Sequence, residues 1–139
     1  MKDTGFANGA NDHRRGIDFI GVSCSFVCHD GKGHVLLHKR SKHCRDEQGR
    51  WDNGGGAHEF GSEDMQFLKV GDLHRKLDDG TPTHWVAVWY AVLVDPEQVK
   101  NNEPYKIDDI GWFTYDKLPK PLHSAIHRSL GAAHDAGII

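Results

Sequence analysis

One segment of the chain, residues 50–64, combines three consecutive glycines with a cluster of carboxylates. Its candidate residues are Gly54, Gly55, Gly56, Glu59, Glu63 and Asp64. Glycine allows close approach of the backbone to a charged ligand, and clustered carboxylates are hard oxygen ligands that suit Mg²⁺ or Mn²⁺. The segment therefore indicates phosphate chemistry. The same composition also fits a glycine-rich hairpin with a solvated acidic tip.

The residues before this segment predict a β-hairpin that would position it. Apolar and small polar side chains alternate through residues 17–28, a period of two that fits a half-buried strand. Asp30 and Gly31 signal a turn, and residues 35–40 form the returning strand. Residues 41–50 are polar and are expected to form a loop that leads to the glycines.

The residues after the segment predict more strands and one helix. Residues 65–73 and 110–113 are expected to be extended, with a turn at 78–82. Residues 85–94 are apolar at every position, which predicts a central strand covered on both faces. A helix is expected from Pro121 to about Ala136, with Gly137 as its C-terminal cap.

A resemblance to a known family supports the phosphate interpretation. Residues 55–61, Gly-Gly-Ala-His-Glu-Phe-Gly, resemble the opening of the Nudix box, G-x5-E-x7-R-E-U-x-E-E-x-G-U, with U a bulky aliphatic residue. Trp51 and the three glycines after it, and the later stretch 102–119, are similar to what precedes and follows that box in MutT-like Nudix hydrolases. The resemblance runs from about Ile20 to about Ile126. It implies an α+β fold, a mixed β-sheet sandwich with a C-terminal helix.

The second half of the box is not found in this sequence. Ser62 stands where the family has a glutamate, and His74 and Arg75 stand at the Glu-Glu positions. The box helix is therefore expected to be missing or truncated between Glu63 and Met65. Without it, one sheet face would be open, and we expect this face to expose Phe67, Leu68 or Trp89 and to be buried in a homodimer.

The resemblance also implies a set of site residues. Nudix hydrolases use a divalent cation to cleave nucleoside diphosphate-linked (pyrophosphate) substrates, so Mg²⁺ or Mn²⁺ is the expected cofactor of an active protein. The implied catalytic residues are Glu59 and Glu63. The implied substrate-binding residues are Arg40, Gly55 and Gly56, and the implied metal ligands are Gly56, Glu59, Glu63 and Glu103. The alternatives are a solvated strand end for Arg40, a local backbone contact for Glu59, and solvated acids for Glu63 and Glu103.

Three interpretations of function follow. The first is a Nudix-type hydrolase with a degenerate metal site, and the second is a non-catalytic Nudix-fold module for ligand binding or protein association. The third is that a segment has been lost from this chain near Glu63. A nucleotide-like small molecule is the expected ligand of the first two.

Composition sets the remaining expectations. At 139 residues we expect one domain, residues 16–139, after a loose arm formed by residues 1–15. A net charge of -3 gives no reason to expect nucleic acid or an anionic membrane as partner. No signal peptide or spanning segment is evident, which predicts a cytoplasmic protein. The eleven histidines show no zinc spacing, although His123 and His127 are four apart, and we expect surface histidines.

Overall fold

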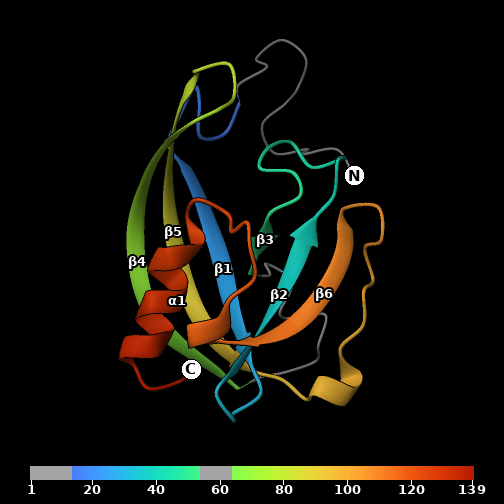
Figure 1. The fold of residues 1–139 in the computed structure, drawn as a ribbon. Coiled ribbons are helices and arrows are strands. Elements are labelled where there is room, and N and C mark those ends of the chain that lie inside the picture. The colour runs from blue at the N-terminus through green and yellow to red at the C-terminus, as the bar shows by residue number, and fades with distance from the viewer. Residues whose placement is uncertain (1–13, 54–63) are drawn as a thin grey trace.

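The protein is described by a computed structural model, which covers residues 14–53 and 64–139. Six strands form one mixed sheet, and a single α-helix of this part of the chain packs on it (Figure 1). The strands are β1 (Gly21–His29), β2 (His34–Arg40), β3 (Trp51–Asp52), β4 (Met65–Lys76), β5 (Pro82–Leu93) and β6 (Ile107–Thr114). The helix is α1 (Ile126–Asp135), and short 3-10 helices span Pro96–Gln98 and Tyr115–Lys117. The expected α+β fold is confirmed. No described helix is long and apolar enough to cross a membrane.

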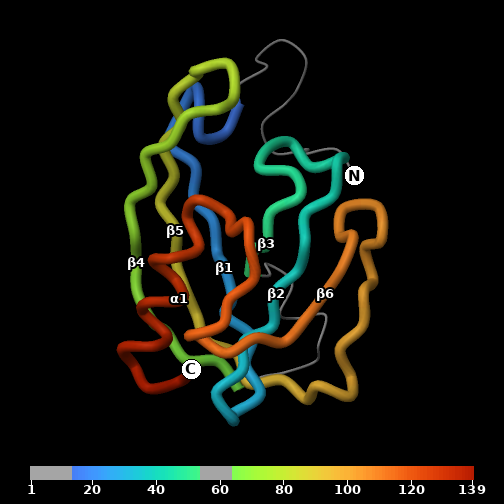
Figure 2. Tube along the Cα trace, viewed as in Figure 1, coloured from blue at the N-terminus to red at the C-terminus, as the bar shows by residue number. Residues whose placement is uncertain are grey.

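The first hairpin forms as predicted, but its two strands soon separate. Asp30 closes the turn by accepting hydrogen bonds from the backbone N–H groups of Lys32 and His34, at 2.7 and 3.1 Å. β1 and β2 are paired only beside the turn, where His29 lies opposite Val35. Further along, β1 pairs in parallel with β5, whereas β2 pairs with β6 and β3. The sheet therefore opens into two halves, β4–β5–β1 and β3–β2–β6, which Figure 2 shows diverging above the turn.

β4 and β5 form a long antiparallel hairpin around the predicted turn. β5 lies between β1 and β4, so its predicted central position is confirmed. Its two faces differ, however, because Ala87 and Trp89 are buried on one side, while Val86 and Val88 are half-buried on the other. The expectation of a strand covered on both faces is therefore wrong over this part of β5.

The helix starts later than the sequence pattern predicted. α1 begins at Ile126, not at Pro121. The reason is that the preceding backbone is bound to β3: Trp51 N donates to the Pro121 carbonyl and His123 N donates to the Trp51 carbonyl, both at 2.8 Å. The predicted end is confirmed. Gly137 has φ of 76° and donates to His134, and the next residue donates to Ala133, which is the Schellman pattern of hydrogen bonds.

The main core lies between α1 and the inner face of the sheet. It contains Val27 of β1, Val35 and Leu37 of β2, and Ile126, Leu130 and Ala133 of α1. The α1 members are spaced by three or four positions, so they form one apolar stripe on the helix. This packing fixes α1 across the opening between the two halves of the sheet.

The opposite, outer face of β4–β5–β1 is apolar and open. Val22 is 68% exposed, Phe67 55% and Val70 52%, and the register of the three strands puts them on one face. The predicted exposure of Phe67 is thus confirmed. The predictions for Leu68 and Trp89 are wrong: Leu68 sits at a bulge and packs against the core, and Trp89 points to the inner face, where it is 3% exposed.

Candidate functional site

A cavity of about 210 Å³ opens where β1 and β2 separate. Its walls come from β1, β2, β3, β4, β5 and the start of α1, so residues distant in the sequence meet here. Small side chains of β1 leave the space, and aromatic and charged side chains surround it. The lining includes Arg40, Arg45, Asp46, Asp52, Asn53, Arg75, Trp89, His123 and Ser129.

Ion pairs hold two of the arginines in the cavity wall. Arg40 donates from Nη2 to Asp46 Oδ1 at 2.9 Å, and its Nη1 lies 3.4 Å from Asp52 Oδ2. Its Nε and Nη2 also donate to the Asp46 carbonyl oxygen at 3.1 Å. The Arg40 side chain is only 19% exposed, so the alternative of a solvated strand end is wrong. Arg75 pairs with Glu47 at 2.5 Å and with Asp46 at 3.6 Å.

Glu47 is the residue that ties the loop before β3 to the region before α1. Its carboxylate accepts hydrogen bonds from Ser124 N and Ser124 Oγ, at 2.7 and 2.8 Å, and lies 2.9 Å from His123 Nε2. Its backbone has φ of 47°, a region that non-glycine residues rarely adopt. Such backbone strain persists only where surrounding contacts hold it, and here the contacts are those to Ser124, His123 and Arg75.

Burial favours the neutral form of two histidines, His123 in the cavity wall and His38 in β2. His123 is 7% exposed, so the expectation of surface histidines is wrong for this residue. Loss of hydration lowers the pKa of His123, and the nearby carboxylates of Asp52 and Glu47 offset only part of that effect. The pKa of His38, in β2, is lowered for the same reason, with opposing contributions from Asp52 and Glu103. Both imidazoles are therefore biased toward the neutral form at pH 7.

The wall of the cavity contains one guanidinium nitrogen with an unmet hydrogen bond. Nε of Arg75 is buried and has no partner among the residues that the structure describes, although Nη1 of the same side chain is paired. A buried donor without an acceptor costs about 1–3 kcal/mol. An acceptor oxygen of a bound ligand would remove this penalty.

The structure places two of the sequence-predicted site residues. Arg40 lines the cavity, and Glu103 lies in the exposed loop before β6. Ser41, the residue after Arg40, is hydrogen-bonded to the loop that contains Glu103. Its N donates to the Lys106 carbonyl at 2.9 Å and its Oγ donates to the Tyr105 carbonyl at 2.6 Å. The other predicted residues, Gly55, Gly56, Glu59 and Glu63, lie outside the described residues. The described chain before them ends at Asn53, which lines the cavity and donates to Ser129 Oγ at 2.9 Å.

Sequence reasoning missed most of the charged wall. No sequence motif marks the charged residues of this region, because their partners lie on other elements. These residues are Asp46, Glu47, Arg75 and His123. The one available signal is the concentration of charge in residues 41–50, which by itself predicts only a polar loop.

Comparison with known proteins identifies the fold. No protein-family model matches the sequence. A MutT NUDIX hydrolase from Burkholderia pseudomallei is similar over 82% of this chain and 98% of its own, with 25% identity and a TM-score of 0.67. A NUDIX hydrolase from Nitrosomonas europaea is similar over 86% of this chain and 91% of its own, with 16% identity and a TM-score of 0.54. A UDP-X diphosphatase is similar over 94% of this chain and 66% of its own, with 14% identity and a TM-score of 0.51.

The chain therefore has the Nudix-type hydrolase fold. The structure of the Burkholderia protein combines the highest TM-score of these three with almost complete coverage of its own chain, so the fold is shared across nearly that whole domain. The absence of the box helix stays a prediction, because residues 54–63 precede β4 and lie outside the described part.

Proposed function

We propose that this protein is a Nudix-type hydrolase of nucleoside diphosphate-linked substrates, with a degenerate metal site, and that it acts in the cytoplasm. The observation that carries the proposal is the cavity between β1 and β2, which has three arginines in its wall and is reached by the chain just before the glycine-rich segment. The fold shared with Nudix hydrolases supports it.

The arginines suit a diphosphate because guanidinium groups make charge-assisted hydrogen bonds to phosphate oxygens. Arg40 and Arg75 are held in place by carboxylates, so their positive charge is largely balanced. Arg45 lines the cavity and is exposed, which leaves its guanidinium available to a ligand at the surface. In this proposal Arg45 binds phosphate, Arg75 Nε donates to a second oxygen, and Arg40 orients the wall.

The described residues alone do not provide a magnesium site. The carboxylates of Asp46, Glu47 and Asp52 are each engaged by arginine, so they are poorly placed to supply a hard cation with free oxygen ligands. By the family resemblance, Mg²⁺ or Mn²⁺ would be held by the Gly56 carbonyl and by Glu59 and Glu63, with Glu103 as a further carboxylate. Such an ion neutralises the charge of a pyrophosphate when bound.

Two measurements test the proposal together. Turnover of a panel of nucleoside diphosphate sugars is followed with Mg²⁺ or Mn²⁺ at about millimolar concentration, because Mg²⁺ keeps several waters and is bound through few carboxylates. Binding of a nucleoside diphosphate is measured by calorimetry for the wild type, Arg45→Ala and the control Lys42→Ala, which changes an exposed residue of the same loop outside the cavity wall.

We expect metal-dependent turnover, and a loss of about 10-fold in affinity for Arg45→Ala alone, since a hydrogen bond to a charged group contributes roughly 1.5–3 kcal/mol. Equal binding by both variants would refute the assigned role of Arg45. Binding without turnover would refute the hydrolase proposal and favour a non-catalytic binding module.

The alternative is a non-catalytic Nudix-fold module that binds a ligand or associates with protein. The exposed outer face of β4–β5–β1 favours this second candidate, and a second copy of this chain is the partner we propose. Two copies related by a twofold axis could pack these apolar faces against each other and remove them from water. Light scattering at micromolar concentration should give the mass of a dimer, and a monomer mass would refute this part of the proposal.

A further inference from the structure

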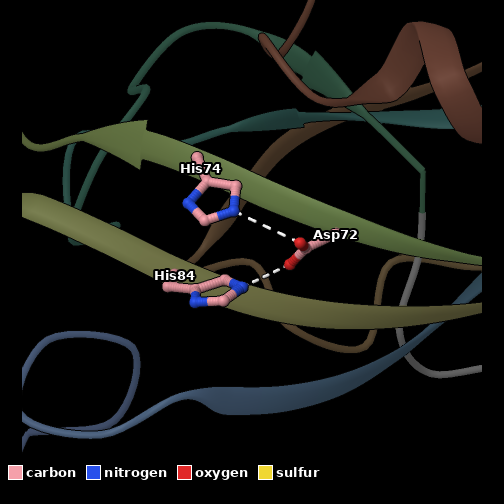
Figure 3. Close-up of side chains that lie close together, drawn as sticks. All are labelled: Asp72, His74 and His84. Atoms are coloured by element: carbon pink, nitrogen blue, oxygen red, sulfur yellow. Dashed lines mark hydrogen bonds and ion pairs between the residues drawn. The ribbon is translucent and has the colours of Figure 1, made fainter.

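A second cluster of polar side chains lies on the outer face of the sheet, away from the cavity. It consists of Asp72 and His74 on β4 and His84 on β5, which Figure 3 shows facing one another above the two strands. Their ligand atoms all lie within 4.8 Å of one another. Among the residues that the structure covers, this is the one group of three histidine, cysteine or acidic side chains with such spacing.

The hairpin register creates the cluster. His74 lies directly opposite His84, and their rings stack with centroids 4.0 Å apart. Asp72 is two residues before His74, so both side chains project from the same face of β4. Leu73 and Arg75 point to the other face and line the cavity. The cluster and the candidate active site are therefore separated by the sheet.

The carboxylate holds both imidazoles by hydrogen bonds. Asp72 Oδ2 lies 3.2 Å from His74 Nε2, and Asp72 Oδ1 accepts from His84 Nε2. One anionic oxygen ligand and two imidazole nitrogens thus converge on one point.

We propose that Asp72, His74 and His84 form a binding site for a divalent transition-metal ion of the zinc class. Imidazole and carboxylate groups bind Zn²⁺ at about 2.0–2.2 Å, so two ligands of a tetrahedral ion lie roughly 3.3 Å apart. The 3.2 Å between Asp72 Oδ2 and His74 Nε2 is close to that spacing, and all the ligand atoms lie within 4.8 Å of one another. Two nitrogen ligands and one oxygen ligand favour Zn²⁺, Co²⁺ or Ni²⁺ over Mg²⁺, which prefers oxygen ligands alone.

The backbone under the cluster is fixed from two sides. Arg128 of α1 donates from Nη1 to the Asp72 carbonyl oxygen at 2.6 Å, and His84 N donates to the Gly16 carbonyl at 2.7 Å. Ligands on paired strands are held more precisely than ligands on loops. Three protein ligands leave the fourth position of a tetrahedral ion open to water or to a group from another molecule.

Binding of ZnCl₂ to the full chain by calorimetry tests the proposal, in the presence of excess Mg²⁺ to occupy oxygen sites. Variants His74→Ala and His84→Ala remove one ligand each, and His127→Ala is the control because it removes an exposed histidine on α1. The spectrum of bound Co²⁺ provides an independent reading of the ligand set.

We expect one Zn²⁺ per chain at this site, and a loss of at least about 10-fold in affinity for His74→Ala and for His84→Ala, since loss of a supporting group alone costs 10–100-fold. His127→Ala should bind like the wild type. Absence of Zn²⁺ binding, or the same affinity after removal of both His74 and His84, would overturn the proposal. Nucleoside diphosphate binding is measured in the same variants and should be unchanged, which keeps this outcome independent of the cavity.

Discussion

The close packing of Gly71 against the Trp89 ring predicts that an added methyl group at position 71 destabilises the protein. Gly71 lies on β4, and a Cβ placed there would be 2.1 Å from Cη2 and 2.5 Å from Cζ3 of the Trp89 ring. The ring is 3% exposed and has Arg128 on it, with the guanidinium carbon 5.5 Å from the ring centroid. The indole therefore cannot yield toward solvent, and Gly71→Ala must push it toward the cavity that it lines.

The expected cost follows from overpacking. Inserting a methyl group into a packed site costs about 1–3 kcal/mol. For a domain of this size, roughly 3 °C of melting temperature corresponds to 1 kcal/mol, so Gly71→Ala should melt about 3–10 °C below the wild type. The cavity should also shrink, so nucleoside diphosphate binding should weaken as stability falls.

Gly131→Ala is the matched control for this substitution. Gly131 is in the middle of α1, and an added Cβ would meet only the Tyr115 hydroxyl oxygen at 4.0 Å, an ordinary contact. Removing a helical glycine should stabilise by about 0.5–1 kcal/mol. Thermal and urea unfolding measure both variants. If Gly71→Ala were as stable as the wild type within about 0.5 kcal/mol, a surface-like change, the packing argument for Trp89 would be refuted.

Three further predictions concern the charged wall and the helix end. Arg40→Ala should destabilise the fold by about 1–3 kcal/mol in urea unfolding, because it removes the arginine paired with Asp52 and the nearer of the two arginines paired with Asp46, and both carboxylates are mostly buried. An unchanged midpoint would contradict the ion-pair arrangement. The pKa of His123 is lowered in the folded state, so the unfolded chain binds more protons and the free energy of unfolding should fall as pH drops below about 6.5. This loss of stability should be smaller in His123→Gln than in the wild type. An equal loss in the wild type and the variant would exclude His123 as its source. Gly137→Ala should cost about 1–2 kcal/mol, because alanine is strained at the positive φ of 76°, and thermal unfolding with no loss would argue against the Schellman cap.

The predicted strands were mostly correct because their signals are local. The alternation before residue 28 and the Asp30-Gly31 turn fixed β1, although β1 starts at Gly21 instead of Ile17. The earlier residues form a turn in which Ile17 N and Asp18 N donate to the Arg14 carbonyl. The C-terminal cap at Gly137 was also predicted, since a glycine after an apolar stripe needs no distant partner to end a helix.

The histidine cluster was missed although a signal for it existed. The predicted turn at residues 78–82 is centred near Asp79, and His74 and His84 are each five positions from it. Folding the hairpin about that point on paper places the two imidazoles opposite each other. Linear zinc spacing does not detect such a pair, because the ligands meet through strand register.

By itself, the sequence determined the strand and turn pattern, the C-terminal helix, and the resemblance that led to the Nudix-type fold. Only the tertiary structure decided that β1 leaves β2 to pair with β5, that a cavity opens in the gap, and that Arg40 is bound to carboxylates in its wall. It also decided that the Asp72 cluster lies on the opposite face. Periodicity and turn chemistry act over a few residues, whereas strand pairing and charge pairing join groups tens of residues apart, and no local pattern encodes those partners.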